Sequence, residues 1–438
     1  MMSRELTLIL SQRLWQAVAG LVTVVFVIRY LSAEEQGWYY TFVSLAALYS
    51  VFEMGLSSAL VQSVGHVFPG LRWLPKGNLE GLRADLFKSF LGQAVRVYLR
   101  LAIAFALFIL LIGFAYFSLK SQPSEDFGYW TGPWLGLVLA TGSAMMTLPL
   151  LAIVEGTGAI VEVYSVRLLQ GVVGAASCWV MLATGASLWA TAAVPAAATL
   201  VALIWVLCYR RDTMSMAVST PDPIAFNWQT KISHLQWRVS ISWIGIYIMS
   251  QLATPILFYF QDPVVAGQMA LSLTVAQMLG IVAQASMARV VPAMSAAVAA
   301  DSWQELDRLF RRGLIGFFVV FVLGLMGAVL AYALISTTTY ATRLLPVAQL
   351  IELVIFVFFY QFNAALSSQL RAFSREPLAW VYVVGAVLTL AGSFAMASTE
   401  SSAGVVRVML LVQVGFVFPL SLVLWHYNLR HWRKDVKN

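Results

Sequence analysis

Long apolar runs separated by short polar segments dominate the pattern of the chain. Roughly 20 consecutive apolar residues suffice for one helix to cross the hydrocarbon core of a bilayer. On this criterion the sequence predicts about twelve membrane-spanning helices, in two sets of six. The first set covers 9–31, 36–62, 93–118, 129–154, 163–184 and 187–209. The second set covers 236–260, 263–291, 313–335, 344–370, 376–398 and 403–427.

A polar segment with two prolines, residues 210–235, separates the two sets of runs. Clusters of proline and polar residues between periodic segments are typical of linkers. We therefore predict an N-terminal six-helix bundle over 1–209 and a cytoplasmic linker over 210–235. A C-terminal six-helix bundle with a short basic tail is expected over 236–438.

The two halves resemble each other at one position. The segment that opens the second helix, LSAEEQG ending at Gly37, has a counterpart in QDPVVAG ending at Gly267, which opens the eighth. An even number of helices in each half gives both halves the same orientation in the membrane. The predicted fold class is an all-α integral membrane protein with two pseudo-symmetric bundles.

The composition excludes most other classes of protein. The chain is 60% apolar and only 11% charged, with a mean hydropathy of +0.81, whereas soluble domains are about half apolar and a quarter charged. A soluble enzyme, a nucleic-acid-binding module and a disordered scaffold are therefore excluded. Cys178 and Cys208 lie in apolar runs and are interpreted as packing residues. Neither a phosphate-binding GxxxxGK[ST] loop nor an HExxH zinc motif occurs, so we predict no metal, no cofactor and no ATP-driven step.

The distribution of basic residues predicts the orientation. Lysine and arginine concentrate on cytoplasmic connections of membrane proteins. With the N-terminus inside, only four of the 27 basic residues fall on the outer side, namely Arg29, Lys120, Arg343 and Arg407. The opposite orientation would invert the rule, so both termini are predicted to be cytoplasmic.

Two arginines are candidates for binding an anionic substrate within the membrane. If the first two helices form a hairpin, Arg13 lies level with Glu53 in the inner half of the bilayer. In the second half, the same construction places Arg238 beside Gln284. Ionisable residues at this depth usually face a partner or a wet cavity, and guanidinium matches phosphate oxygens. The alternatives are a structural Arg13–Glu53 ion pair and an Arg238 that reaches the interface.

The tenth predicted helix carries a polar face. Glu352, Phe356, Phe359 and Asn363 recur at helical spacing. Such a face lines a cavity or forms hydrogen bonds between helices. The carboxylate of Glu352 could carry a coupling proton, or could pair with a neighbouring helix. Both interpretations stay open at this stage.

The first two helices also carry a family resemblance. The stretch RYLSAEEQGWY from Arg29 to Tyr39, followed by FEMGLS from Phe52 to Ser57, resembles the opening of bacterial polysaccharide biosynthesis flippases. These belong to the multidrug/oligosaccharidyl-lipid/polysaccharide (MOP) exporter superfamily. The resemblance covers the whole chain as twelve helices in two bundles, with the residue-level match in the first sixty residues.

The resemblance implies translocation of an undecaprenyl-diphosphate-linked oligosaccharide from the inner to the outer leaflet by alternating access. It implies a cleft role for Arg13 and Glu53, with Arg29 near the outer mouth. The expected partners are the lipid-linked oligosaccharide, membrane lipids and other polysaccharide assembly proteins, but no nucleic acid. The expected location is the bacterial cytoplasmic membrane.

Two other functions are weighed against the flippase. A drug or cation antiporter of the same superfamily would favour acidic groups in the cleft. A membrane-embedded polysaccharide polymerase or ligase would need catalytic residues in a large outer loop. The longest predicted outer loop, about 119–129, offers only Glu125 and Asp126, so we expect a transporter rather than an enzyme.

Overall fold

The computed structural model describes residues 4–68, 71–81, 84–119, 128–218, 244–373 and 375–435. Within these residues 11 helices are long and apolar enough to cross a membrane. They coincide with the predicted spans except the seventh, 236–260, whose first part lies outside the described residues. From residue 244 onward that span is again mostly helical and includes α11 (Ala253–Phe260). The predicted fold class, an all-α membrane protein with about twelve helices, is confirmed.

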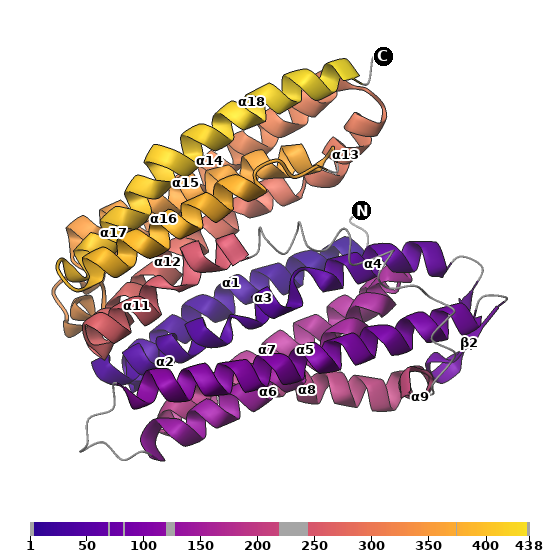
Figure 1. Cartoon of the computed structure of the whole chain (residues 1–438), viewed down its shortest axis with the longest axis horizontal. Helices are drawn as coiled ribbons and strands as arrows, with labels where there is room; N and C mark the ends of the chain where they lie inside the picture. The colour runs from indigo at the N-terminus through magenta and orange to yellow at the C-terminus, as the bar shows by residue number, and fades with distance from the viewer. Residues whose placement is uncertain are drawn as a thin grey trace. The chain divides into compact units, whose positions relative to one another are not determined.

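The described chain forms two compact units, each of packed long helices (Figure 1). The first contains residues 1–31 and 42–243, and the second contains residues 32–41 and 244–438. The elements of the first unit are α1 (Arg4–Tyr30), the end of α2 (Ala33–Ala46), α3 (Tyr49–Glu53), α4 (Leu56–Val67), β1 (Arg72–Trp73), η1 (Pro75–Gly77), β2 (Leu79–Glu80), α5 (Ala84–Ser118), α6 (Gly128–Gly156), α7 (Ile160–Ala183), η2 (Ser187–Trp189), α8 (Ala190–Tyr209) and α9 (Arg211–Val218). Those of the second are the start of α2, α11, α12 (Pro263–Ala288), α13 (Val291–Ala299), α14 (Trp303–Ile335), η4 (Thr339–Arg343), α15 (Val347–Arg371), α16 (Ala379–Ala397), α17 (Ser401–Val412), η5 (Gln413–Val417) and α18 (Phe418–Asp435).

The start of α2 packs within the second unit although most of its sequence neighbours belong to the first. The buried side chain of Gln36 donates hydrogen bonds to the carbonyl oxygens of Gly267 (2.9 Å) and Arg343 (3.3 Å). Gly37 approaches α12 so closely that a Cβ atom there would overlap the backbone of Pro263. The glycines that end the two similar sequence segments, Gly37 and Gly267, are therefore in direct contact.

The predicted linker begins later than expected. Residues 211–218 form α9, which packs in the first unit through buried Met216 and Ala217. The hydroxyl of Thr213 donates a hydrogen bond of 2.7 Å to the carbonyl oxygen of Gly77. Hydropathy misses this short segment because only two of its residues are buried apolar groups. The remainder of the predicted linker, 219–235, lies outside the described residues.

A charged cluster holds α9 and the short antiparallel β1–β2 pair to the first unit. The guanidinium of Arg210 donates to Glu162, with Nε 2.9 Å from Oε1, and lies 4.5 Å from the ring centroid of Trp73. The indole of Trp205 donates to the same carboxylate at 2.8 Å. Arginine combines a bidentate ion pair with aromatic stacking more readily than lysine does.

Two helices are longer than their predicted spans. α5 contains 35 residues and α14 contains 33, against roughly 20 needed for the hydrocarbon core. Both start about ten residues earlier than hydropathy indicates, in amphipathic segments that carry Asp85 and Glu305 in the first turns. Charged first turns stabilise a helix N-terminus but lower the local hydropathy, so the sequence criterion places the start too late.

Candidate functional site

The second membrane-spanning segment is broken in its middle. The helix α3 ends at Glu53, and α4 begins at Leu56. Between them Met54 and Gly55 have φ angles of 54° and 68°, in the left-handed region that glycine tolerates and methionine rarely adopts. A continuous helix was predicted over 36–62, and this break is the principal difference in the first unit.

Glu53 satisfies the polar groups that the break exposes. One carboxylate oxygen accepts a hydrogen bond from the Gly55 amide at 2.9 Å, and the other accepts from the Ser57 amide at 2.5 Å. The hydroxyl of Tyr98 on α5 donates to the same carboxylate at 2.8 Å. Tyr98 is itself fully buried and lies 2.9 Å from the Ser57 hydroxyl.

The Glu53 cluster, comprising Glu53, Ser57 and Tyr98, therefore has a clear structural role. The first amides of a helix have no partner within the helix, and in hydrocarbon no water replaces it. A carboxylate that accepts hydrogen bonds from them caps α4, and its negative charge suits the positive end of the helix dipole. Non-helical backbone at membrane depth also occurs where helices line a cavity in transporters.

Arg13 and Glu53 form no ion pair among the residues that the structure describes. Arg13 is exposed on α1, 17 residues before the end of that helix at Tyr30. At 1.5 Å per residue this is about 25 Å along the axis, near the inner boundary of the hydrocarbon core. The structural-pair interpretation is wrong because the carboxylate is occupied by backbone amides and Tyr98.

The polar face of α15 points into the second unit, as the helical spacing predicts. Asn363 is 1% exposed and Phe356 is equally buried, whereas Glu352 is half-buried. Neither polar atom of the Asn363 side chain has a hydrogen-bond partner. Glu352 makes no hydrogen bond or ion pair with any described residue. Among the described residues, the carboxylate of Glu352 at one end of this face and the buried amide of Asn363 at the other therefore have no hydrogen-bond partner.

Gln284 of α12 extends the polar region toward α15. Its amide donates a hydrogen bond of 2.5 Å to the carbonyl oxygen of Gln361, and Gln361 itself is buried over Gly280. A buried polar group without a partner costs about 1–3 kcal/mol. The bond from Gln284 is therefore an interhelical contact of the kind that joins membrane helices.

A second buried amide, Gln413, stands at a helix irregularity. It begins the π-helical turn η5, is fully buried, and has no hydrogen-bond partner at either side-chain polar atom. Contacts from α15 to α18, such as Gln369 with Trp425 and Phe362 with Phe418, relate the two helices by a constant offset. This offset places Gln413 nearly two turns, about 9 Å along the helix axis, from the level of Asn363. π-Helical turns are frequent at functional sites.

Two further site residues were predicted, Arg29 and Arg238. Arg29 lies exposed in the last turn of α1, and Arg238 lies outside the described residues. Sequence reasoning missed Tyr98 and Gln413 as members of the polar clusters. Tyr98 carries no distinctive signal in an aromatic-rich span, whereas a glutamine within an apolar run is a signal that could have identified Gln413.

Comparison with solved structures connects this architecture to known proteins. The chain resembles an inward-facing multidrug resistance MATE family transporter of the MOP superfamily, with a TM-score of 0.71, 14% identity and 96% of both chains covered. It also resembles the lipid II flippase MurJ in an inward closed conformation, with a TM-score of 0.66 and 12% identity over 97% of this chain and 87% of that one. A third similar structure is the eukaryotic MATE transporter AtDTX14, with a TM-score of 0.63 and 15% identity over 99% and 98% of the two chains.

No family model and no curated protein matches the sequence. The structural likeness extends over nearly the whole length of each protein, but the identities of 12–15% show the fold alone. The long helices, the two units and this likeness lead to one conclusion. The chain is a multi-pass membrane protein with the fold of MOP-superfamily transporters.

Proposed function

We propose that this protein is a flippase that moves an undecaprenyl-diphosphate-linked oligosaccharide from the inner to the outer leaflet of the bacterial cytoplasmic membrane. It acts by alternating access and performs no covalent chemistry of its own. The fold supports a transporter, because similar structures include a lipid II flippase and MATE transporters. The motif around Arg29–Tyr39 and Phe52–Ser57 favours the polysaccharide branch.

One observation carries the preference for an anionic substrate. The intramembrane carboxylate of the first unit, Glu53, accepts hydrogen bonds from the amides of Gly55 and Ser57 and from the hydroxyl of Tyr98, and it is not available to a cationic substrate. The basic group at similar depth, Arg13, is exposed and has no acidic partner among the described residues. An uncommitted guanidinium suits the phosphate oxygens of a lipid diphosphate.

A second candidate function, export of organic cations in exchange for protons, is favoured by a different residue. Glu352 is half-buried in α15 and has no partner among the described residues. A lone intramembrane carboxylate is suited to carry a proton or to attract a cationic substrate. Glu352 could equally carry the coupling proton of a flippase. Only the identity of the transported substrate therefore distinguishes the two functions.

Ligand-induced stabilisation separates the two substrates. A ligand that binds only the folded protein raises its stability by an amount that grows with ligand concentration. We expect a short undecaprenyl-diphosphate oligosaccharide to raise the thermal unfolding midpoint of the purified protein in detergent. Undecaprenol should have no such effect, and Arg13→Ala should reduce the shift. Stabilisation by organic cations, abolished by Glu352→Gln and absent with the diphosphate, would instead establish the antiporter.

A further inference from the structure

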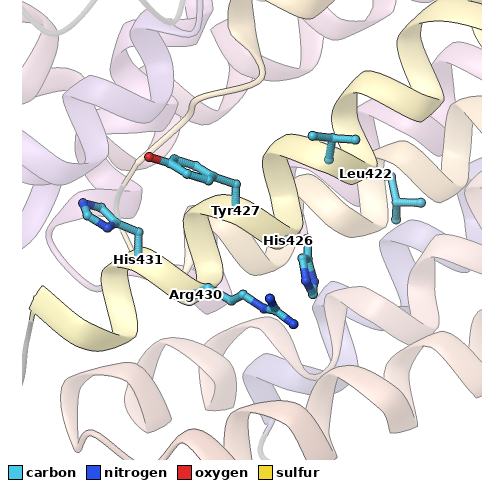
Figure 2. A pocket seen from close by; sticks show the side chains of 6 residues that line it. Leu422, His426, Tyr427, Arg430 and His431 are labelled. Atoms are coloured by element: carbon cyan, nitrogen blue, oxygen red, sulfur yellow. The ribbon is translucent and has the colours of Figure 1, made fainter.

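The exposed face of α18 carries a hollow that the proposed transport cycle does not use. The hollow has a volume of about 580 Å³ and is lined by Leu422, Val423, His426, Tyr427, Arg430 and His431 (Figure 2). These residues form two rows at a spacing of four, so they share one helical face. The volume is within the range of small-molecule sites, about 300–1,000 Å³.

The opposite face of α18 is firmly packed. Ser421, Leu429 and Trp432 are buried, and Trp425 donates a hydrogen bond of 2.9 Å to the Gln369 side chain. Near the end of the helix Arg433 pairs with Asp307 of α14. The hollow therefore stands on a helix whose rotation is fixed by its inner contacts.

The lining changes chemistry along the helix. The segment from residue 408 to 425 contains no charged side chain, and the basic residues begin at His426. Eighteen helical residues span about 27 Å, close to the thickness of the hydrocarbon core. Leu422 and Val423 thus lie at the acyl-chain level, while His426, Arg430 and His431 lie among headgroups, next to the aromatic side chain of Tyr427.

The described side chains that line the hollow are basic or neutral. Among the described residues that line it, none carries a carboxylate. Arg430 forms no hydrogen bond or ion pair with any described residue. Arg433, about one turn further along α18, pairs with Asp307 instead. The ring of Tyr427 stacks on His431, with centroids 5.9 Å apart. Figure 2 shows the Arg430 side chain extending from α18 on the same side of the ribbon as His426.

We propose that this hollow is a binding site for an anionic glycerophospholipid. The phosphate contacts Arg430 and His426, and the first carbons of an acyl chain pack on Leu422 and Val423. Charge complementarity supports this ligand, because basic pockets at the ends of membrane helices bind anionic headgroups. In the predicted orientation the lipid belongs to the inner leaflet. This lipid is distinct from the transported substrate, and the inference does not depend on the proposed function.

Native mass spectrometry with added phosphatidylglycerol tests the site. Wild-type protein should retain one phosphatidylglycerol molecule more tightly than phosphatidylcholine. Arg430→Ala should weaken retention about fivefold, the effect of one basic residue near an anionic surface. Arg312→Ala, which removes an exposed arginine of α14, is the matched control and should leave retention unchanged.

Three results would overturn the proposal. Equal retention of phosphatidylglycerol and phosphatidylcholine would show that charge does not select the lipid. Equal losses in Arg430→Ala and Arg312→Ala would show general surface electrostatics rather than a site. Displacement of the lipid by undecaprenyl diphosphate at equal concentration would assign the hollow to the transported lipid. A circular-dichroism melting curve for each variant confirms that it is folded.

Discussion

Glu53→Ala is expected to lower the free energy of unfolding by about 2–3 kcal/mol. The substitution removes an acceptor that serves the amides of Gly55 and Ser57 and the hydroxyl of Tyr98. In the membrane these donors gain little from water, so each remains partly unsatisfied. Denaturant or thermal unfolding of the purified protein in detergent measures the loss.

Two further variants make the Glu53 prediction specific. Glu34→Ala removes the same charge from an exposed position of α2 and should change stability by less than about 0.5 kcal/mol. Tyr98→Phe removes only one of the three donors and should cost about 1 kcal/mol. If Glu53→Ala were as stable as Glu34→Ala, Glu53 would not cap α4.

Gly37→Ala is expected to destabilise the packing of α2 on α12 by about 1–3 kcal/mol. The new methyl group would overlap the backbone carbonyl of Pro263, and a backbone atom cannot move aside as a flexible side chain can. Relief of the overlap requires α2 to move away from α12, which lengthens the hydrogen bond from Gln36 to Gly267. Thermal unfolding measures the cost.

Gly327→Ala provides the control for Gly37→Ala. Gly327 lies within α14, and a Cβ atom there meets no other atom within 4 Å. Alanine has the higher helix propensity by about 1 kcal/mol, so this variant should be as stable as the wild type or more stable. A Gly37→Ala protein with unchanged stability would show that the close contact between α2 and α12 is not needed.

Hydrophobic runs predicted the long helices of this fold because burial in lipid demands length and apolarity, which a sequence displays directly. They could not predict the break at Met54 and Gly55, because the segment remains apolar through it. They also placed the starts of α5 and α14 too late, since the first turns of both helices are charged. Hydropathy measures how favourably side chains partition into lipid, and it carries no information about backbone dihedral angles.

The candidate site was harder to predict from the sequence than the long helices were. Helical spacing was enough to predict that Asn363 and Phe356 share a face, and both are buried. The depth argument that paired Arg13 with Glu53 assumed two straight helices, whereas the break at Met54 supplies Glu53 with nearer donors. Tyr98, the third donor to Glu53, lies 45 residues away in the chain, and no periodicity connects it to Glu53.

Leaflet translocation in proteoliposomes tests the central claim most directly. The measurement follows the exposure of undecaprenyl-diphosphate oligosaccharide on the opposite leaflet, with protein-free vesicles as the baseline. We predict translocation by the wild-type protein and strong loss in Arg13→Ala at matched amounts of folded protein. Absence of translocation for several lipid-linked sugars, together with proton-driven export of organic cations by the same vesicles, would contradict the account.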